Sequence, residues 1–509
     1  MLPATEQPPI PPPTPPATPS PAPQRTDRRV LLNTGSLAAS SLWRVGISFV
    51  LQLAIARLLG AQGLGQYATA LAWLNVCQIL SELGLPQLLV RDLARHPERK
   101  RTLFHAALVA QLTAALLIWG AIYALTALLP YQPETRFALL FVTASLPFFA
   151  ITSASEMLFQ ASERMELVMG VEVTINTLIV AGSLAVLGQG GGVVALCGVL
   201  VITQAISAAL CGWLVYRGRL LGDPPRDTSG QLQENLRYLW GHARPFYGLA
   251  LANVLLHRLD ILLLSIFAGE KVTGIYSAAY LVVRVLIILA QTWWQSLYPT
   301  LSRLRVQAEE QYRRLASLSI RFGLMAFLPG AALSGGATDW LLGIVYQGED
   351  HSAALAAYSA LIWAAPVFLV ASYAVNLLLV ERRPQGSLLI AGTHIVVALS
   401  LLPFLTARWQ ALGAALAMVA AIGCSGLVGL ALLRGLKIQA GLPRQLVLLV
   451  GATLAAALFQ RWLGTIFPGS ALWPLLLLAG SALYLALIWW GGALSGGDLA
   501  LLRNALRRK

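Results

Sequence analysis

Charged residues are scarce in this sequence. Asp, Glu, Lys and Arg together make up 11% of its 509 residues, whereas about a quarter of the residues in a soluble protein are charged. Hydrophobic residues make up 57%. So little charge cannot cover a water-exposed surface, and this excludes an ordinary soluble globular protein.

Cysteine and histidine are also rare, with four and six residues respectively. All four cysteines lie within apolar runs, and none has CxxC or CxxH spacing. We therefore predict no metal site. We expect Cys77, Cys197, Cys211 and Cys424 to be buried as small apolar side chains.

The first 29 residues lack the apolar segment of a signal peptide. They read MLPATEQPPIPPPTPPATPSPAPQRTDRR, and proline at this density favours an extended, solvated chain that cannot build a core. We predict a disordered, Pro-rich cytoplasmic tail over residues 1–29.

Long apolar runs make up most of the chain after residue 30. A helix needs about 20 apolar residues to cross a hydrocarbon layer of about 30 Å, and the alternating pattern of a transmembrane barrel is absent. The runs predict an all-α polytopic membrane protein with about fourteen transmembrane helices.

The basic residues support this layout, because Lys and Arg are retained in cytoplasmic loops. With both termini on the cytoplasmic side, 28 of the 36 basic residues fall in segments inside the cell. The formal net charge of +14 then reflects loops that face anionic membrane lipids, and we expect no nucleic-acid partner.

A short motif occurs twice, as GAQGLGQYATA at 60–70 and GEKVTGIYSAA at 269–279. The matched turn residues are Gly60 and Gly269, Gly65 and Gly274, and Tyr67 and Tyr276. Glycine permits a short reversal of the chain, and tyrosine suits the interface between lipid and water. We predict two equivalent turns, each joining consecutive membrane helices.

A second pair of similar segments, PFFAITSASEMLFQASER at 147–164 and PVFLVASYAVNLLLVERR at 366–383, indicates that the repeat covers six helices. Parallel repeats of this kind hold the substrate site between them near the membrane midplane. The predicted parts are an N-lobe at 31–216, a cytoplasmic linker at 217–239, a C-lobe at 240–433, two further helices within 445–494 and a basic cytoplasmic tail at 495–509.

Five ionisable residues lie at the predicted mid-depth of the membrane, namely Arg44, His257, Arg258, Asp260 and Arg284. A charge there is costly unless it meets a partner or water. We place these residues in a wet cavity between the lobes, with Asp260 paired to Arg284 or Arg44; the alternative is that they only tie helices together. His257 and Asp260 share a helix face, and Arg258 lies on another. The surplus of guanidinium groups suits phosphate.

Other polar residues within the spans have two interpretations. The acids could gate transport or couple it to a cation, or they could be solvated at the interface; they are Glu82, Glu156, Glu172 and Asp339. The amides either bond across helices or line the cavity; they are Asn75, Asn176, Asn253, Gln291 and Asn376.

Three segments resemble the Wzx-type polysaccharide-biosynthesis flippases, which belong to the multidrug/oligosaccharidyl-lipid/polysaccharide (MOP) exporter superfamily. They are NTGSLAASSLWRVGISFVLQLAIARLLGAQGLGQYATA (33–70), LDILLLSIFAGEKVTGIYSAAYLVVRV (259–285) and LYPTLSRL (297–304). The likeness covers residues 31–433. It implies a MATE-like fold of two six-helix lobes in a V shape around a cationic cavity with alternating access.

For function, the resemblance implies a flippase in the bacterial plasma membrane. The implied substrate is an undecaprenyl-diphosphate-linked oligosaccharide, a unit of O-antigen, capsule or exopolysaccharide, which moves from the inner to the outer leaflet. Arg44, Arg258 and Arg284 would correspond to the cavity arginines, and Asp260 to the aspartate of the seventh helix.

We expect no covalent chemistry and no cofactor, although an H⁺ or Na⁺ gradient or the membrane potential could drive transport. Membrane lipids and the lipid-linked substrate are the expected partners, and a polysaccharide polymerase and chain-length machinery are candidates. The expected state is a monomer.

Three rival functions are open. A membrane-embedded transferase, polymerase or ligase would need acids or histidines on sizeable outer loops, and here these loops are short, with one cluster at Glu349, Asp350 and His351. A cation-coupled drug or metabolite antiporter should carry more acids than arginines at mid-depth. A flippase for the lipid-linked peptidoglycan precursor would share the mechanism but carry another substrate.

Overall fold

The computed structural model describes residues 24–96, 99–218, 220–221, 231–343, 345, 349–434, 442–467 and 472–491. Regular structure within these residues is entirely helical. Eleven helical stretches are long and apolar enough to cross a membrane. Three of them, at Gly46–Arg95, Val254–Gln307 and Pro384–Leu433, reach 50 to 54 residues and change direction partway. Each of the three therefore provides two crossings, and the prediction of about fourteen transmembrane helices is confirmed.

The N-terminal lobe begins with a long helix that breaks at Gly60. Its described helices are α1 (Gln24–Glu82), α2 (Leu85–Arg95), α3 (Lys100–Thr126), α4 (Pro133–Thr143), α5 (Leu146–Ala161), α6 (Met165–Gly188) and α7 (Val193–Arg217). Proline stands in the first turn of α2, α4 and α5, where its missing N–H removes no helical hydrogen bond.

The C-terminal lobe begins with a second long helix, which breaks at Gly269. Its described helices are α8 (Gln231–Gln307), α9 (Glu309–Gly336), α10 (Thr338–Gly343), α11 (Glu349–Leu361), α12 (Ala364–Val380) and α13 (Pro384–Leu433). The last two helices, α14 (Leu442–Ile466) and α15 (Trp473–Trp490), pack as a pair against α9.

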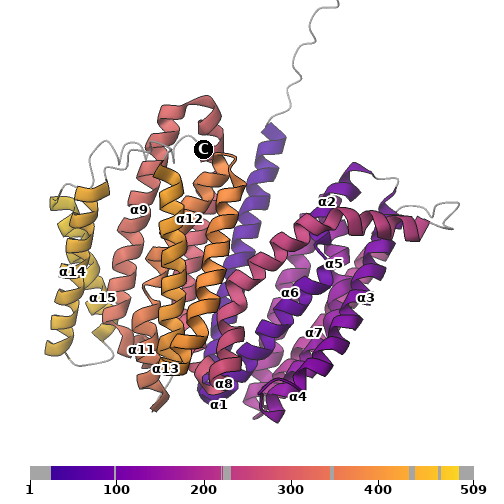
Figure 1. Ribbon diagram of the computed structural model, residues 1–509, viewed down its shortest axis with the longest axis horizontal. Helices are drawn as coiled ribbons and strands as arrows, with labels where there is room; N and C mark the ends of the chain where they lie inside the picture. Colours follow the sequence, from indigo (N-terminus) through magenta and orange to yellow (C-terminus); the bar gives the residue numbers. More distant parts are fainter. Residues whose placement is uncertain are drawn as a thin grey trace, which may run out of the picture.

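The two lobes converge where α1 and α8 turn and diverge toward the opposite end (Figure 1). We call these the turn end and the far end. Around the turns, one apolar core contains side chains from both lobes, including Leu64 and Ile275. Toward the far end there are two cores, one around Phe104 in the N-lobe and one around Trp294 in the C-lobe. The lobes are therefore joined by packing at the turn end.

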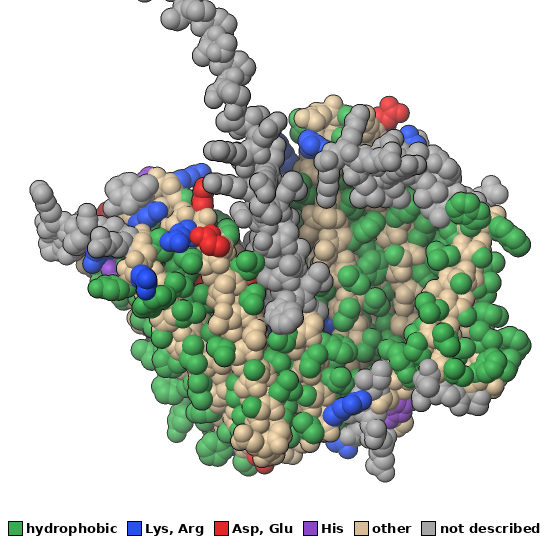
Figure 2. Space-filling view, turned by 180° about the vertical axis from the view of Figure 1, so that it is seen from behind, with side chains coloured by type: hydrophobic (Ala, Val, Ile, Leu, Met, Phe, Trp, Pro, Cys, Tyr) green, Lys and Arg blue, Asp and Glu red, His purple; other side chains and the backbone are tan. Residues whose placement is uncertain are grey.

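The outer surface of the helices is largely apolar. Figure 2 shows hydrophobic side chains along the flanks of both lobes, with acidic and basic side chains gathered toward the two ends. This distribution fits a lipid-facing belt between two polar faces. Cys424 shares this exposed position, so its predicted burial is wrong, whereas Cys77, Cys197 and Cys211 are buried as predicted.

Two predicted boundaries differ from the structure. Helix α1 begins at Gln24, inside the predicted tail, while residues 1–23 and 495–509 lie outside the described part of the chain. Helix α8 begins at Gln231, inside the predicted linker. Its polar first turns pack on the N-lobe, where Arg99 donates a hydrogen bond to Asn235 (2.8 Å). Polar composition suggested a loop. The prediction was wrong because these polar residues have hydrogen-bond partners in the other lobe, which the sequence does not show.

Candidate functional site

The two repeated turns have the same backbone geometry. Gly60 has φ 68° and ψ −169°, and Gly269 has φ 80° and ψ 176°. This region of φ/ψ space is open almost only to glycine. Each glycine lets a membrane helix reverse with no intervening loop, so that the second halves of α1 and α8 run back from the turn end.

The turns of the two lobes contact each other and a loop of the N-lobe. Gly65 and Gly274 lie where the turns meet. The hydroxyls of Tyr131 and Ser265 are 2.9 Å apart, and the backbone N–H of Gln132 donates to Oε1 of Glu270 (3.0 Å). These bonds hold the lobes together at the turn end.

The turn tyrosines do not lie at the membrane interface, contrary to the sequence-based prediction. Tyr67 is buried and lines a cavity. Tyr276 is fully buried, and its hydroxyl donates to Oδ2 of Asp260 (2.8 Å). The side chains point inward because each turn packs against its counterpart, which covers positions that would face lipid in a single hairpin.

A cavity of about 510 Å³ lies between the lobes. Its walls come from α1, α6 and α8, from Leu64 and Tyr67 near the turn end to Gln295 toward the far end. Its polar and charged lining residues are Ser48, Gln52, Tyr67, Asn176, His257, Arg258, Ser277, Tyr280, Arg284, Gln291, Thr292 and Gln295.

Arg258, Arg284 and His257, three of the predicted site residues, line this cavity. The guanidinium groups of Arg258 and Arg284 make no hydrogen bond or ion pair with any described residue, and they lie close enough to repel each other. Both come from α8, one from each side of its turn. Such groups can bind an anion that supplies several acceptor oxygens.

Asp260 is not part of the cavity lining. Its side chain is buried with Tyr276 as its partner, and no described ion pair joins it to Arg284. The predicted pairing with Arg284 is therefore not found. The cavity lining on the first half of α8 consists of His257, Arg258 and Ile261, so Arg258 lines the cavity beside His257, although the sequence placed them on different faces. Adjacent positions on a helix are about 100° apart and can both reach a wide cavity, which residue spacing alone does not reveal.

Arg44 lies on α1, and its side chain is outside the described part of the structure. None of the four acids that could gate or couple transport, Glu82, Glu156, Glu172 and Asp339, is among the described lining residues of the cavity. Glu82 accepts a hydrogen bond from Ser153 (3.2 Å), and Glu156 is close enough to Glu82 to feel its charge. Asp339 is exposed and pairs with His351 (3.6 Å).

The intramembrane amides divide into two groups. Asn176 and Gln291 line the cavity. Asn75 and Asn376 do not, and each donates to a carbonyl of the preceding turn of its own helix. The side chain of Asn253 is outside the described set.

Several lining residues were missed by reasoning from the sequence. Ser48, Gln52, Ser277 and Gln295 carry no charge and occur within ordinary apolar runs. Ser277 and Gln295 lie on the same helix as Arg284, and Ser48 and Gln52 lie on α1, the repeat counterpart of α8. Their helical spacing from the arginines was the one signal in the sequence that could have placed them in the cavity.

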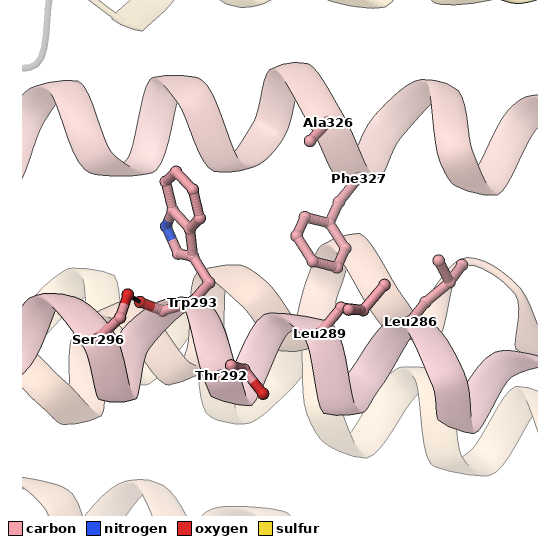
Figure 3. A pocket seen from close by; sticks show the side chains of 7 residues that line it. All are labelled: Leu286, Leu289, Thr292, Trp293, Ser296, Ala326 and Phe327. Atoms are coloured by element: carbon pink, nitrogen blue, oxygen red, sulfur yellow. Dashed lines mark hydrogen bonds between the residues drawn. The ribbon is translucent and has the colours of Figure 1, made fainter. Parts of the chain in front are cut away.

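A smaller hollow of about 360 Å³ lies between α8 and α9. Figure 3 shows the rings of Trp293 and Phe327 projecting into it, whereas Thr292 points away from them. Thr292 also borders the larger cavity. The hollow is apolar, and it follows a different face of α8 from the one that carries Arg284.

Comparison with solved structures identifies proteins of the same fold. The structure is similar to the lipid II flippase MurJ in an inward closed conformation, with a TM-score of 0.72 and 10% identity over 88% of this chain and 97% of that one. It is similar to an inward-facing multidrug resistance MATE family transporter of the MOP superfamily, with a TM-score of 0.62 and 12% identity over 78% and 94%.

A third similar structure is a MOP superfamily transporter from Pyrococcus furiosus, described as having a binding pocket of reverse polarity. Its TM-score is 0.54, with 12% identity over 80% of this chain and 96% of that one. These similarities confirm the predicted MOP fold. No curated protein matches the sequence.

The family model for polysaccharide biosynthesis proteins matches residues 30–305. The match covers more than half of the chain and includes both repeated turns and both cavity arginines. The chain therefore belongs to the polysaccharide biosynthesis protein family and has the fold of the MOP superfamily.

Proposed function

We propose that the protein is a flippase for an undecaprenyl-diphosphate-linked oligosaccharide, and that it works by alternating access. One observation carries the proposal: the cavity between the lobes holds the guanidinium groups of Arg258 and Arg284, and no carboxylate is among its described lining residues. Arginine binds diphosphate oxygens through paired, charge-assisted hydrogen bonds. Membership in the polysaccharide biosynthesis protein family supports the same substrate class.

The proposed transport needs no covalent chemistry. A sugar–diphosphate head cannot cross hydrocarbon, because its charges and hydroxyls would lose their hydrogen bonds to water. A polar cavity replaces that water while the lipid tail stays in the bilayer. We therefore propose a transporter without a catalytic cofactor, driven by an ion gradient or by the membrane potential.

The distribution of basic residues supports an orientation in which the turn end faces outward and both termini lie in the cytoplasm of a bacterial cell. In this orientation the described state is closed to the outside by the contact between the turns. Alternating access requires this contact to open after the substrate has entered from the inner leaflet.

The test is a flipping assay with the full chain reconstituted in proteoliposomes. The fraction of lipid-linked oligosaccharide that an external reagent can modify is followed over time. We expect the protein to accelerate the exchange between leaflets, and R284A to reduce the acceleration. Correctly inserted protein with no effect on the exchange would contradict the proposal.

A second candidate is a flippase for the lipid-linked peptidoglycan precursor. The similarity to the lipid II flippase MurJ, at a TM-score of 0.72, favours it, and the same two arginines could bind its diphosphate. Lipid II in the same assay separates the two candidates by their relative rates. A cationic drug is disfavoured because guanidinium groups would repel it, and uptake of a cationic dye by the same vesicles tests that function.

A further inference from the structure

One face of α8 carries a series of polar side chains along the cavity. Ser277, Arg284 and Gln291 follow one another at seven-residue spacing, and Gln295 comes one turn later. Seven residues are close to two helical turns, so these positions lie on one face. The face extends from near the turn end toward the far end.

The amides of Gln291 and Gln295 differ from the other amides in the cavity. Neither makes a hydrogen bond to any described residue. By contrast, Gln52 donates to Ser48 (3.0 Å), and Asn176 donates to the Glu172 carbonyl (2.7 Å). Gln291 and Gln295 therefore have free donors and acceptors on the same wall as Arg284.

The two sides of Arg284 offer different surroundings to a ligand. Toward the turn end, the wall carries the hydroxyl groups of Tyr67, Ser277 and Tyr280. Apolar side chains such as Leu64 and Leu281 lie around them, next to the core that both lobes share. Toward the far end, Gln291 lies about 10 Å and Gln295 about 16 Å farther along the helix, at 1.5 Å rise per residue. A polar group linked to a phosphate at Arg284 meets hydroxyl groups of the packed turn end in the first direction, and along this face of α8 it meets primary amides only in the second direction.

We propose that Gln291 and Gln295 determine sugar specificity: they bind the hydroxyls of the sugars next to the diphosphate. This inference rests on the proposed flippase function, in which Arg258 and Arg284 bind the diphosphate. A primary amide offers two donors and one acceptor carbonyl, which matches neighbouring hydroxyls on a neutral sugar ring. The oligosaccharide then extends along α8 toward the far end, while the contact between the two turns keeps the turn end closed.

Binding measurements on the purified full chain separate the sugar contacts from the diphosphate contacts. The probes are undecaprenyl diphosphate without sugar and the same lipid carrying a short oligosaccharide. We expect the wild type to bind the sugar-bearing lipid more tightly. The double variant Q291A/Q295A should bind the sugar-bearing lipid with about tenfold lower affinity, as expected for the loss of two neutral hydrogen bonds. Its affinity for the sugar-free lipid should be unchanged.

Two controls frame the result. N376A removes an intramembrane amide that does not line the cavity, and it should bind both lipids like the wild type. R284A should bind both lipids with lower affinity, because it removes a contact to the diphosphate.

The measurements have five possible outcomes. Selective loss of the sugar-bearing lipid in Q291A/Q295A supports it. Equal loss of both lipids, or no loss, overturns it. If the wild type binds both lipids equally, the inference is overturned, but the proposed diphosphate site remains supported. A wild type that binds neither lipid overturns the proposed function together with the inference.

Discussion

Gly65 and Gly274 cross each other backbone to backbone at the turn end. A Cβ atom added to Gly65 would collide with the carbonyl group of Glu270, and one added to Gly274 would collide with the carbonyl group of Ala61. The contact is reciprocal, as expected for two copies of one motif that face each other across an approximate two-fold axis. The repeat visible in the sequence therefore forms a close backbone contact between the lobes.

Replacing either crossing glycine with alanine should push the two turns apart. We expect G65A and G274A each to destabilise the protein by about 1–3 kcal/mol through overpacking, measured as a lower midpoint of thermal unfolding in detergent. Each should also make the turn end of the cavity accessible. A cysteine placed at Ser277, in a background with the exposed Cys424 replaced by serine, should then react with an impermeant maleimide added from the turn side.

The matched control for this pair is G120A, because a Cβ atom at Gly120 meets nothing within 4 Å. It should not lower the unfolding midpoint, because alanine is favoured over glycine inside a helix, and it should leave the labelling unchanged. Labelling that is the same in G65A, G274A and G120A would mean that the turns do not close the cavity.

Gly60 and Gly269, at which the helices reverse, should not tolerate substitution, for a different reason. Gly60 and Gly269 have open space around the Cβ position, so steric collision does not limit them. Their positive φ does, because an L-residue in this conformation costs about 1–3 kcal/mol. We expect G60A and G269A to lower the unfolding midpoint by similar amounts, and unequal effects would contradict the equivalence of the two turns.

Glu270 of one lobe caps a helix of the other. Its buried carboxylate accepts the N–H of Gln132, the residue that precedes α4. A negative charge at a helix N-terminus stabilises by about 0.3–1 kcal/mol. We expect E270Q to lower the free energy of unfolding by about this amount. E270A should lower it further, since it leaves the N–H of Gln132 unpaired. E163Q, which removes an exposed acid from the turn between α5 and α6, is the matched control, and unfolding midpoints equal to that control would contradict the cap.

Much of the fold could be predicted because membrane insertion imposes strong rules on the sequence. Apolar length sets the number of crossings, and glycine marks the reversals at Gly60 and Gly269. The arginines could be expected in a cavity because a charge within an apolar helix needs water or a partner, and Arg258 and Arg284 both line the cavity between the lobes.

The orientation of side chains within the membrane could not be predicted. Where nearly every position is apolar, the helical periodicity that distinguishes buried from exposed faces is weak. This is why Asp260 was assigned to the cavity, Tyr67 to the interface and Cys424 to the core. The polar first turns of α8 were misread because their partners, such as Arg99, belong to the other lobe.

The pair formed by Asp260 and Tyr276 offers a test of buried polar packing. Oδ1 of Asp260 has no hydrogen-bond partner in the described structure, so the tyrosine hydroxyl is the main support of this carboxyl group. We expect Y276F to lower the free energy of unfolding by about 1–3 kcal/mol, because it leaves a buried acceptor unsatisfied. D260N should weaken that effect in the double variant, and strictly additive losses in a double-mutant cycle would contradict the coupling.

The arginines provide the most direct test of the transport mechanism. Arg258 and Arg284 repel each other, and neither makes a hydrogen bond or ion pair with a described residue, although the charge of Asp260 also acts on Arg258. R258A and R284A should therefore leave membrane insertion and the unfolding midpoint unchanged or slightly raised. R284A should nevertheless abolish export of a surface polysaccharide, and we expect the same of R44A if that side chain also reaches the cavity. R284K should restore transport only in part, since an ammonium group keeps the charge but lacks the planar pair of donors that matches two phosphate oxygens. Full export by correctly inserted R284A would exclude a diphosphate site at this depth, whereas export by R284K equal to wild type would mean that charge alone suffices.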